Sequence, residues 1–126
     1  MHRGLMASLV ALAVASSCAE PSVAPPRGAP AQILASQTCR EHFSRHAVPT
    51  YPRAAIHDHI SGYAVAVYDL DGSGKAKNIR VVESMPPGIF DNSAIAALES
   101  SSFRGGVKAK ECRYVADFAV VRRSAR

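Results

Sequence analysis

Two runs of alternating apolar residues, joined by a turn rich in Asp and Gly, constrain this chain more than any other feature. Residues 62–69 (GYAVAVYD) alternate Tyr and Val side chains onto one face, as a half-buried strand does. Residues 76–84 (AKNIRVVES) repeat the alternation with Ile and Val. The segment between the runs contains DGSG, in which Gly accepts positive φ. The pattern predicts an antiparallel β-hairpin.

Three further elements are expected around this hairpin. A helix should begin near Pro52, which suits a first helical turn because its missing N–H is not needed there. A second helix should follow Asp91, where apolar residues recur at helical spacing. A third strand is expected over residues 112–121. The fold class is therefore α+β: a three-stranded antiparallel sheet in the order 2-1-3, with both helices on one face and the third strand at an edge.

The N-terminal residues 1–17 have the layout of a secretory signal. Arg3 supplies a positive start, an apolar run extends from Leu5 to Ala15, and small residues follow that suit cleavage. The alternative is an uncleaved helix in the inner membrane, although the uncharged stretch is shorter than the ~20 residues that a spanning helix needs. We expect an exported, periplasmic protein.

Cys18 directly follows the apolar run, and residues 15–18 (ASSC) resemble the lipobox of bacterial lipoproteins. Cys18 would then carry lipid and anchor the protein to a membrane. The alternative is ordinary cleavage nearby. Residues 19–35 are rich in Pro and Ala without apolar periodicity and predict a disordered or semi-extended tether. The expected division is a signal peptide (1–17), a tether with an N-terminal segment (18–47) and a folded domain (48–122).

Cys39 and Cys112 remain if Cys18 is lipidated or removed. In an oxidising compartment two such cysteines are expected to pair. A disulfide closing so long a loop would stabilise the fold by about 4 kcal/mol in the chain-entropy model. We therefore predict a disulfide that ties the segment before the first helix to the start of the last strand.

Several function classes lack support in this sequence. It has no nucleophile elbow, phosphate-binding loop or dinucleotide fingerprint, so we expect neither an enzyme nor a bound cofactor. Cys39, His42 and His46 have spacing typical of metal ligands, but a disulfide-bonded thiol cannot ligate, and no metal is expected. The net charge of +5 is spread along the chain rather than clustered, which does not favour nucleic acid as a partner.

An ordered series of short motifs between about Val48 and Val121 resembles the TonB C-terminal domain family. The series consists of Pro49-x-Tyr51-Pro52-x-x-Ala55, Gly62-Tyr63-Ala64-Val65, Asp71-x-x-Gly74, Ile79-x-Val81-x-x-Ser84, Phe90-Asp91-x-x-Ala94-x-x-Ala97-Leu98 and Phe103. The resemblance implies two helices on a three-stranded antiparallel sheet. It also implies a role in passing inner-membrane energy to outer-membrane receptors.

The same resemblance implies how such a domain binds. A short receptor segment adds to the sheet edge as a strand, so that main-chain hydrogen bonds provide affinity and side-chain pockets provide specificity. Its partner is an outer-membrane TonB-dependent receptor or another protein of the TonB system. Carried over to this chain, the binding residues are Pro49, Tyr51, Pro52, Arg53, Val115, Ala116, Asp117, Phe118, Ala119, Val120 and Val121.

Two alternatives stay open at this point. Tyr51 and Pro52 serve either receptor contact or helix initiation and packing. The whole protein is either a module of energy-dependent transport or an envelope lipoprotein that keeps the same fold and transduces no energy.

Overall fold

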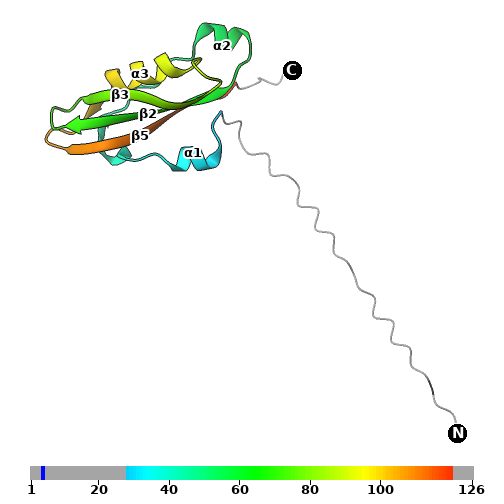
Figure 1. The fold of residues 1–126 in the computed structure, drawn as a ribbon, viewed down its shortest axis with the longest axis horizontal. Coiled ribbons are helices and arrows are strands. Elements are labelled where there is room, and N and C mark those ends of the chain that lie inside the picture. The colour runs from blue at the N-terminus through cyan, green and yellow to red at the C-terminus, as the bar shows by residue number, and fades with distance from the viewer. Residues whose placement is uncertain (1–3, 5–27, 121–126) are drawn as a thin grey trace.

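The protein's structure, a computed structural model, describes Gly4 and residues 28–120. An antiparallel sheet carries helices on both of its faces (Figure 1). In chain order the elements are α1 (Ala31–Ala35), a 3-10 turn (Arg40–His42), β1 (Phe43–Arg45), α2 (Arg53–His57), β2 (Gly62–Asp71), β3 (Ala76–Met85), α3 (Asp91–Ser100), β4 (Ser102–Phe103) and β5 (Lys108–Phe118).

The main sheet has the order β3-β2-β5, and β2 pairs antiparallel with both neighbours. Almost every side chain of β2 is buried, on one face of the sheet or the other, as expected for the central strand. The predicted order, with the third strand beside the first, is confirmed. β5 therefore has β2 on one side only, and its other side is an edge of the sheet.

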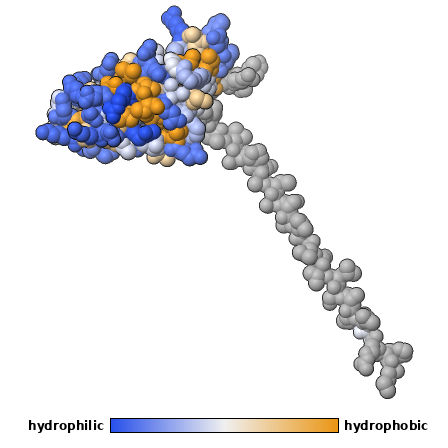
Figure 2. All heavy atoms as spheres, in the orientation of Figure 1, coloured by the Kyte–Doolittle hydropathy of each residue, from blue (hydrophilic) through white to orange (hydrophobic). Residues whose placement is uncertain are grey.

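The hairpin turn forms where the sequence places it. The backbone N–H of Ser73 donates to Oδ1 of Asp71 at 3.0 Å, and Gly72 and Gly74 both have positive φ. Hydrophilic side chains cover this end of the sheet (Figure 2). The hairpin end lies opposite the end of the domain at which α1 and α2 are drawn (Figure 1).

The larger core lies between the sheet and the helices α2 and α3. Phe90 and Leu98 are fully buried there, and each such side chain contributes about 1.5–3 kcal/mol of burial free energy. The rings of Phe90 and Phe118 stack with centroids 4.3 Å apart. The expected placement of the two helices on one face is confirmed, because Ala55 of α2 and Ala94 of α3 enter this same core.

The opposite face of the sheet is covered by residues that were expected to be a tether. Ala29 is buried there against Tyr63, Val65 and Val115, and Ile33 and Leu34 pack on the same cluster. The expectation of a disordered or semi-extended tether is wrong for residues 28–35, of which Ala31–Ala35 form α1. The physical reason is tertiary: α1 has only five residues, too few to be a stable helix alone in water, and it depends on the packing of Ile33 and Leu34 on the sheet.

β5 begins earlier and ends earlier than predicted. It starts at Lys108 rather than Cys112, because the end of β2 continues far enough to pair Asp71 with Lys108. It ends at Phe118. The residues that follow, as far as Val120, are not in a strand, and Val121 lies outside the described residues.

The predicted disulfide between Cys39 and Cys112 is present, with the two Cα atoms 5.6 Å apart. It joins β5 to the 3-10 turn that follows Cys39. After this turn the chain enters β1, which pairs with β4 in a small second sheet. Helical structure between Cys39 and His46 is limited to Arg40–His42.

Candidate partner-binding edge

The outer side of β5 presents backbone groups on alternate residues, because the other half of its backbone groups pair with β2. The amides of Arg113 and Val115 point outward, since each donates to a side chain beyond the edge. Because backbone amides alternate along a strand, the next amide that points outward is that of Asp117. Its backbone amide has no acceptor within residues 28–120.

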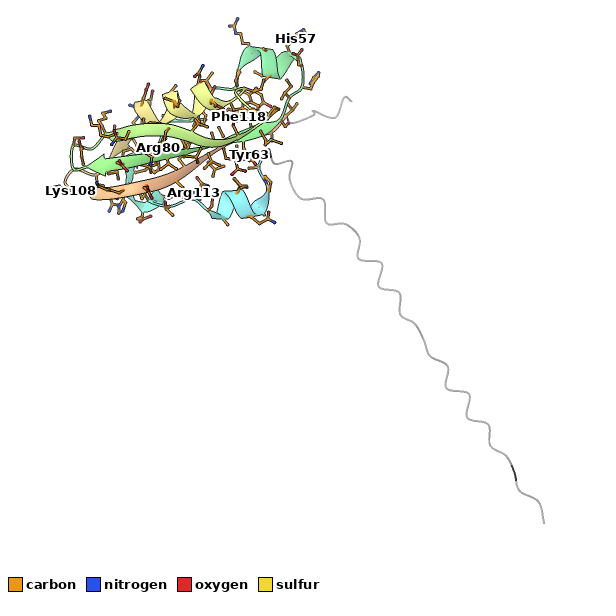
Figure 3. All side chains as sticks on the ribbon, in the orientation of Figure 1. His57, Tyr63, Arg80, Lys108, Arg113 and Phe118 are labelled. Atoms are coloured by element: carbon orange, nitrogen blue, oxygen red, sulfur yellow. A yellow bond between two sulfur atoms is a disulfide. The ribbon has the colours of Figure 1, made fainter. Side chains whose placement is uncertain are left out.

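The outward groups nearest the disulfide already have partners in the chain itself. The amide of Arg113 donates to Oγ1 of Thr38 at 2.8 Å, and the amide of Thr38 donates to the carbonyl oxygen of Arg113 at 3.0 Å. The amide of Val115 donates to Oε1 of Gln37 at 3.4 Å. Figure 3 shows Arg113 on the side of β5 where α1 lies.

A groove of about 420 Å³ runs along this edge. One wall comes from the segment that covers the α1 face, and the other comes from the chain between the 3-10 turn and α2. Its lining residues are Leu34, Gln37, Arg40, Phe43, His46, Pro49, Tyr114, Val115 and Asp117. The groove therefore follows the outward backbone groups of β5 between side chains of both sheet faces.

The chemistry of this groove is mostly apolar and aromatic, with a charged group of each sign. The ring of His46 stands edge-on to Phe43 and to Tyr114, with centroids 4.6 and 5.5 Å away. Desolvation, and then the positive charge of Arg40, lower the pKa of His46 below its usual value. Burial raises the pKa of Tyr114, so its hydroxyl stays protonated. The groove suits an extended segment with an apolar or aromatic side chain.

The predicted edge residues do not all face the groove. Val115 and Asp117 line the groove, and the backbone amide of Val115 donates to Gln37 there. Ala116 and Phe118 instead have side chains in the core, 1% and 3% exposed, and pair with β2. Ala119 and Val120 are half-buried beyond the strand, and the amide of Val120 donates to Oγ of Ser61 at 2.9 Å. Val121 falls outside the described residues.

The predicted residues around Tyr51 also separate. Pro49 lines the groove. Tyr51 turns inward, where its ring stands edge-on to Phe90 and Phe118 and its hydroxyl donates to the carbonyl oxygen of Ile60. Pro52 immediately precedes α2, and Arg53 is its exposed first residue. The structure thus brings Pro49, Val115 and Asp117 to one groove and places Tyr51 in the core.

Sequence reasoning missed Tyr114 of β5 and the groove side chains that come from the chain before α2: Leu34, Gln37, Arg40, Phe43 and His46. No local pattern marks the residues before α2, because they reach β5 only after that part of the chain folds back. The pairing of Cys39 with Cys112 was the one signal, since it tied this part of the chain to the last strand.

The described residues contain neither a metal site nor a membrane-spanning helix. Among residues 28–120, no three or more side chains of the kinds that bind metals come together. The sulfur of Cys39, one of the spacing-based candidates, is held in the disulfide. No helix within the described residues has the length and apolarity to cross a membrane. Cys18 lies outside them.

Comparison with known proteins gives one family and two solved structures. The family described as Gram-negative bacterial TonB protein C-terminal matches residues 47–119. The solution structure of the Pseudomonas aeruginosa TonB C-terminal domain is 24% identical, with a TM-score of 0.53, covering 66% of this chain and 88% of that one. For TonB2 of Vibrio anguillarum the identity is 21% and the TM-score 0.52, with 63% and 86% covered. No curated protein matches this chain.

Proposed function

Since this chain belongs to the family of Gram-negative bacterial TonB protein C-terminal domains, we propose that it is the binding module of an energy-dependent outer-membrane transport system. The family is not enzymatic, it is periplasmic, and it takes part in TonB-dependent energy transduction. The finer proposal concerns the mode of binding. A segment of an outer-membrane receptor adds to the sheet as a strand beside β5.

One observation carries this proposal: the groove of about 420 Å³ lies along the side of β5 that β2 leaves free. A segment placed there would pair with the outward backbone groups of Val115 and Asp117. Main-chain hydrogen bonds of this kind give affinity that does not depend on sequence. Specificity would come from alternate side chains of the segment, which meet Phe43 and Tyr114 on one side and Leu34 on the other.

The N-terminal part of the proposal concerns residues 1–27, where the structure describes only Gly4. We propose that residues 1–17 are a cleaved export signal and that Cys18 becomes a lipidated N-terminus. Intact mass of the protein purified from the periplasmic and membrane fractions tests this. A mass that includes Met1 contradicts cleavage, and a mature mass without added acyl chains contradicts lipidation.

The binding mode is tested at Asp117 with two substitutions. Asp117→Pro and Asp117→Ala both remove the carboxylate, but only Pro also removes the backbone N–H. An edge position tolerates Pro better than a central one, so the fold should survive. The probe is a synthetic peptide covering the N-terminal periplasmic segment of a TonB-dependent receptor from the same organism. Its affinity for the full chain is measured by calorimetric titration.

The expected result is weaker binding by Asp117→Pro than by Asp117→Ala, by about fivefold to tenfold for one lost main-chain hydrogen bond. Equal affinities of the two folded variants would show that the peptide binds elsewhere. Capture of peptidoglycan-associated proteins alone from envelope extract would favour the envelope lipoprotein over the transport module.

A further inference from the structure

Residues 28–38, here called the strap, run antiparallel to β5 along its outer edge. Near one end, the amide of Ala29 donates to Oδ1 of Asp117 at 2.6 Å. At the other end, Gln37 accepts from Val115, and Thr38 exchanges two hydrogen bonds with Arg113. The strap is thus aligned with the edge that the proposed function assigns to a receptor segment.

Both ends of the strap are held in place. A Cβ atom at Gly28 would overlap the carbonyl oxygens of Gly62 and Phe118, so the chain at this point lies directly against two strand ends. At the other end, the residue after Thr38 is Cys39, which is covalently bonded to Cys112 of β5. The strap is therefore a tethered segment that always lies close to the edge.

The strap nevertheless covers the edge incompletely. Its middle is the short helix α1, whose backbone hydrogen bonds are internal and which lies on Tyr63 and Val65 rather than in the plane of the sheet. Two of the three outward amides of β5 are satisfied by strap side chains, and the contact with Gln37 is long, at 3.4 Å. A true strand would satisfy the amide of Val115 with a shorter main-chain hydrogen bond.

From this arrangement we propose that the strap is a built-in competitor for the β5 edge, displaced in part when a receptor segment pairs there. The proposal rests on the proposed function, because it concerns the same edge. A segment that pairs along β5 needs the outward amide of Val115, and to extend further it needs that of Arg113. Gln37 and Thr38 hold those two amides in the unbound chain.

The attachment of the strap at both ends makes this competition effective, although each contact of the strap with β5 is weak. A segment joined by a short linker competes at an effective concentration on the order of millimolar. Its hydrogen bonds must be broken before the incoming strand can form its own. The strap therefore lowers the apparent affinity of the partner, and it shields an edge strand from pairing with a second chain.

The test replaces the two acceptors with side chains of similar shape that cannot accept. The variant Gln37→Met/Thr38→Val is compared with wild type in the full chain, using the receptor peptide described above. Thr38→Ser, which retains the hydroxyl acceptor, is the matched control. The expected result is about tenfold tighter peptide binding by the double variant and unchanged binding by Thr38→Ser.

A measurement without peptide checks the strap contacts directly. In the double variant, hydrogen exchange of the Arg113 and Val115 amides should accelerate, whereas exchange of the Ala116 amide, which faces β2, should not change. Unchanged exchange at Arg113 and Val115 would overturn the proposed role of Gln37 and Thr38, whatever the peptide does.

The outcomes separate this proposal from the proposed function. If Asp117→Pro weakens binding but the double variant binds the peptide as wild type does, or more weakly, the edge is the site and the strap does not compete for it. If no variant and no wild-type chain binds the peptide, the receptor-segment function itself fails. Tighter binding by the double variant, together with weaker binding by Asp117→Pro than by Asp117→Ala, supports both.

Discussion

The ring of Tyr51 stands edge-on to the ring of Phe118, with centroids 5.3 Å apart and planes at 85°. The hydroxyl of Tyr51 also donates to the carbonyl oxygen of Ile60. These contacts join the segment before α2 to the last strand from the core side of the sheet. They favour the packing role of Tyr51 over the receptor-contact role.

Tyr51→Phe should therefore lower stability without changing peptide affinity. The lost hydrogen bond to Ile60 predicts a decrease of about 1 kcal/mol in the free energy of unfolding. Urea denaturation followed by circular dichroism measures this change. A folded Tyr51→Phe chain with wild-type stability and weaker peptide binding would show that the hydroxyl contacts the partner instead.

Removal of the disulfide should lower the stability of the fold. The bond closes a loop with a sequence separation of 73, for which the chain-entropy model gives about 4 kcal/mol. Cys39→Ala/Cys112→Ala should lower the free energy of unfolding by about this amount. Wild type treated with a thiol reductant is the control and should shift equally. Alkylation of the untreated, exported chain should modify neither cysteine, and modification of both would contradict the pairing in the cell.

Tyr68→Phe is expected to stabilise the protein. Tyr68 is fully buried, and its hydroxyl has no hydrogen-bond partner within residues 28–120. Burial, and then the negative charge of Glu41, raise its pKa to about 12, so the group is neutral at every working pH. Removing an unsatisfied buried hydroxyl while keeping the ring should raise the free energy of unfolding by about 1 kcal/mol. Thermal unfolding measures it, and a lower midpoint would show that the hydroxyl has a partner.

The pH dependence of stability should contain a contribution from His46. Because desolvation and Arg40 lower its folded pKa, the neutral ring is favoured in the folded chain. This contribution is complete above the unfolded pKa of about 6.5 and is lost as pH falls below that value toward the lower folded pKa. Unfolding midpoints measured from pH 7.5 downward should therefore fall less steeply in His46→Gln than in wild type. Parallel curves would contradict the predicted shift.

The regular part of the fold could be predicted because its signals are local. Alternation across residues 62–69 and 76–84, with DGSG between them, specifies a hairpin whatever surrounds it. Helical spacing after Asp91 does the same for α3. The start of β5 was not predicted, because Lys108, Lys110 and Glu111 are charged and this part of the chain joins β5 only where β2 extends to meet it.

The candidate site was predicted less completely because most of it depends on long-range contacts. Asp117 and Val115 follow from the expected edge strand, and Pro49 follows from the family resemblance. The contacts of Gln37 and Thr38 with β5 could not be predicted, because these residues follow a segment whose composition predicts a tether. α1 is too short to show periodicity and forms against the sheet. Alternation alone also could not say which residues of β5 face outward until the register with β2 was known.

The disulfide has a mechanical consequence for a protein that is pulled. Tension applied between Gly28 and a partner paired along β5 would follow the strap to Cys39, cross the sulfur–sulfur bond to Cys112 and enter the very strand that holds the partner. The chain from residue 40 to residue 111 forms a closed loop outside this path and bears no covalent load. The hairpin and α3 could then remain folded while force passes from the tethered end to the edge, and that force would act on the partner's hydrogen bonds along the strand, in shear.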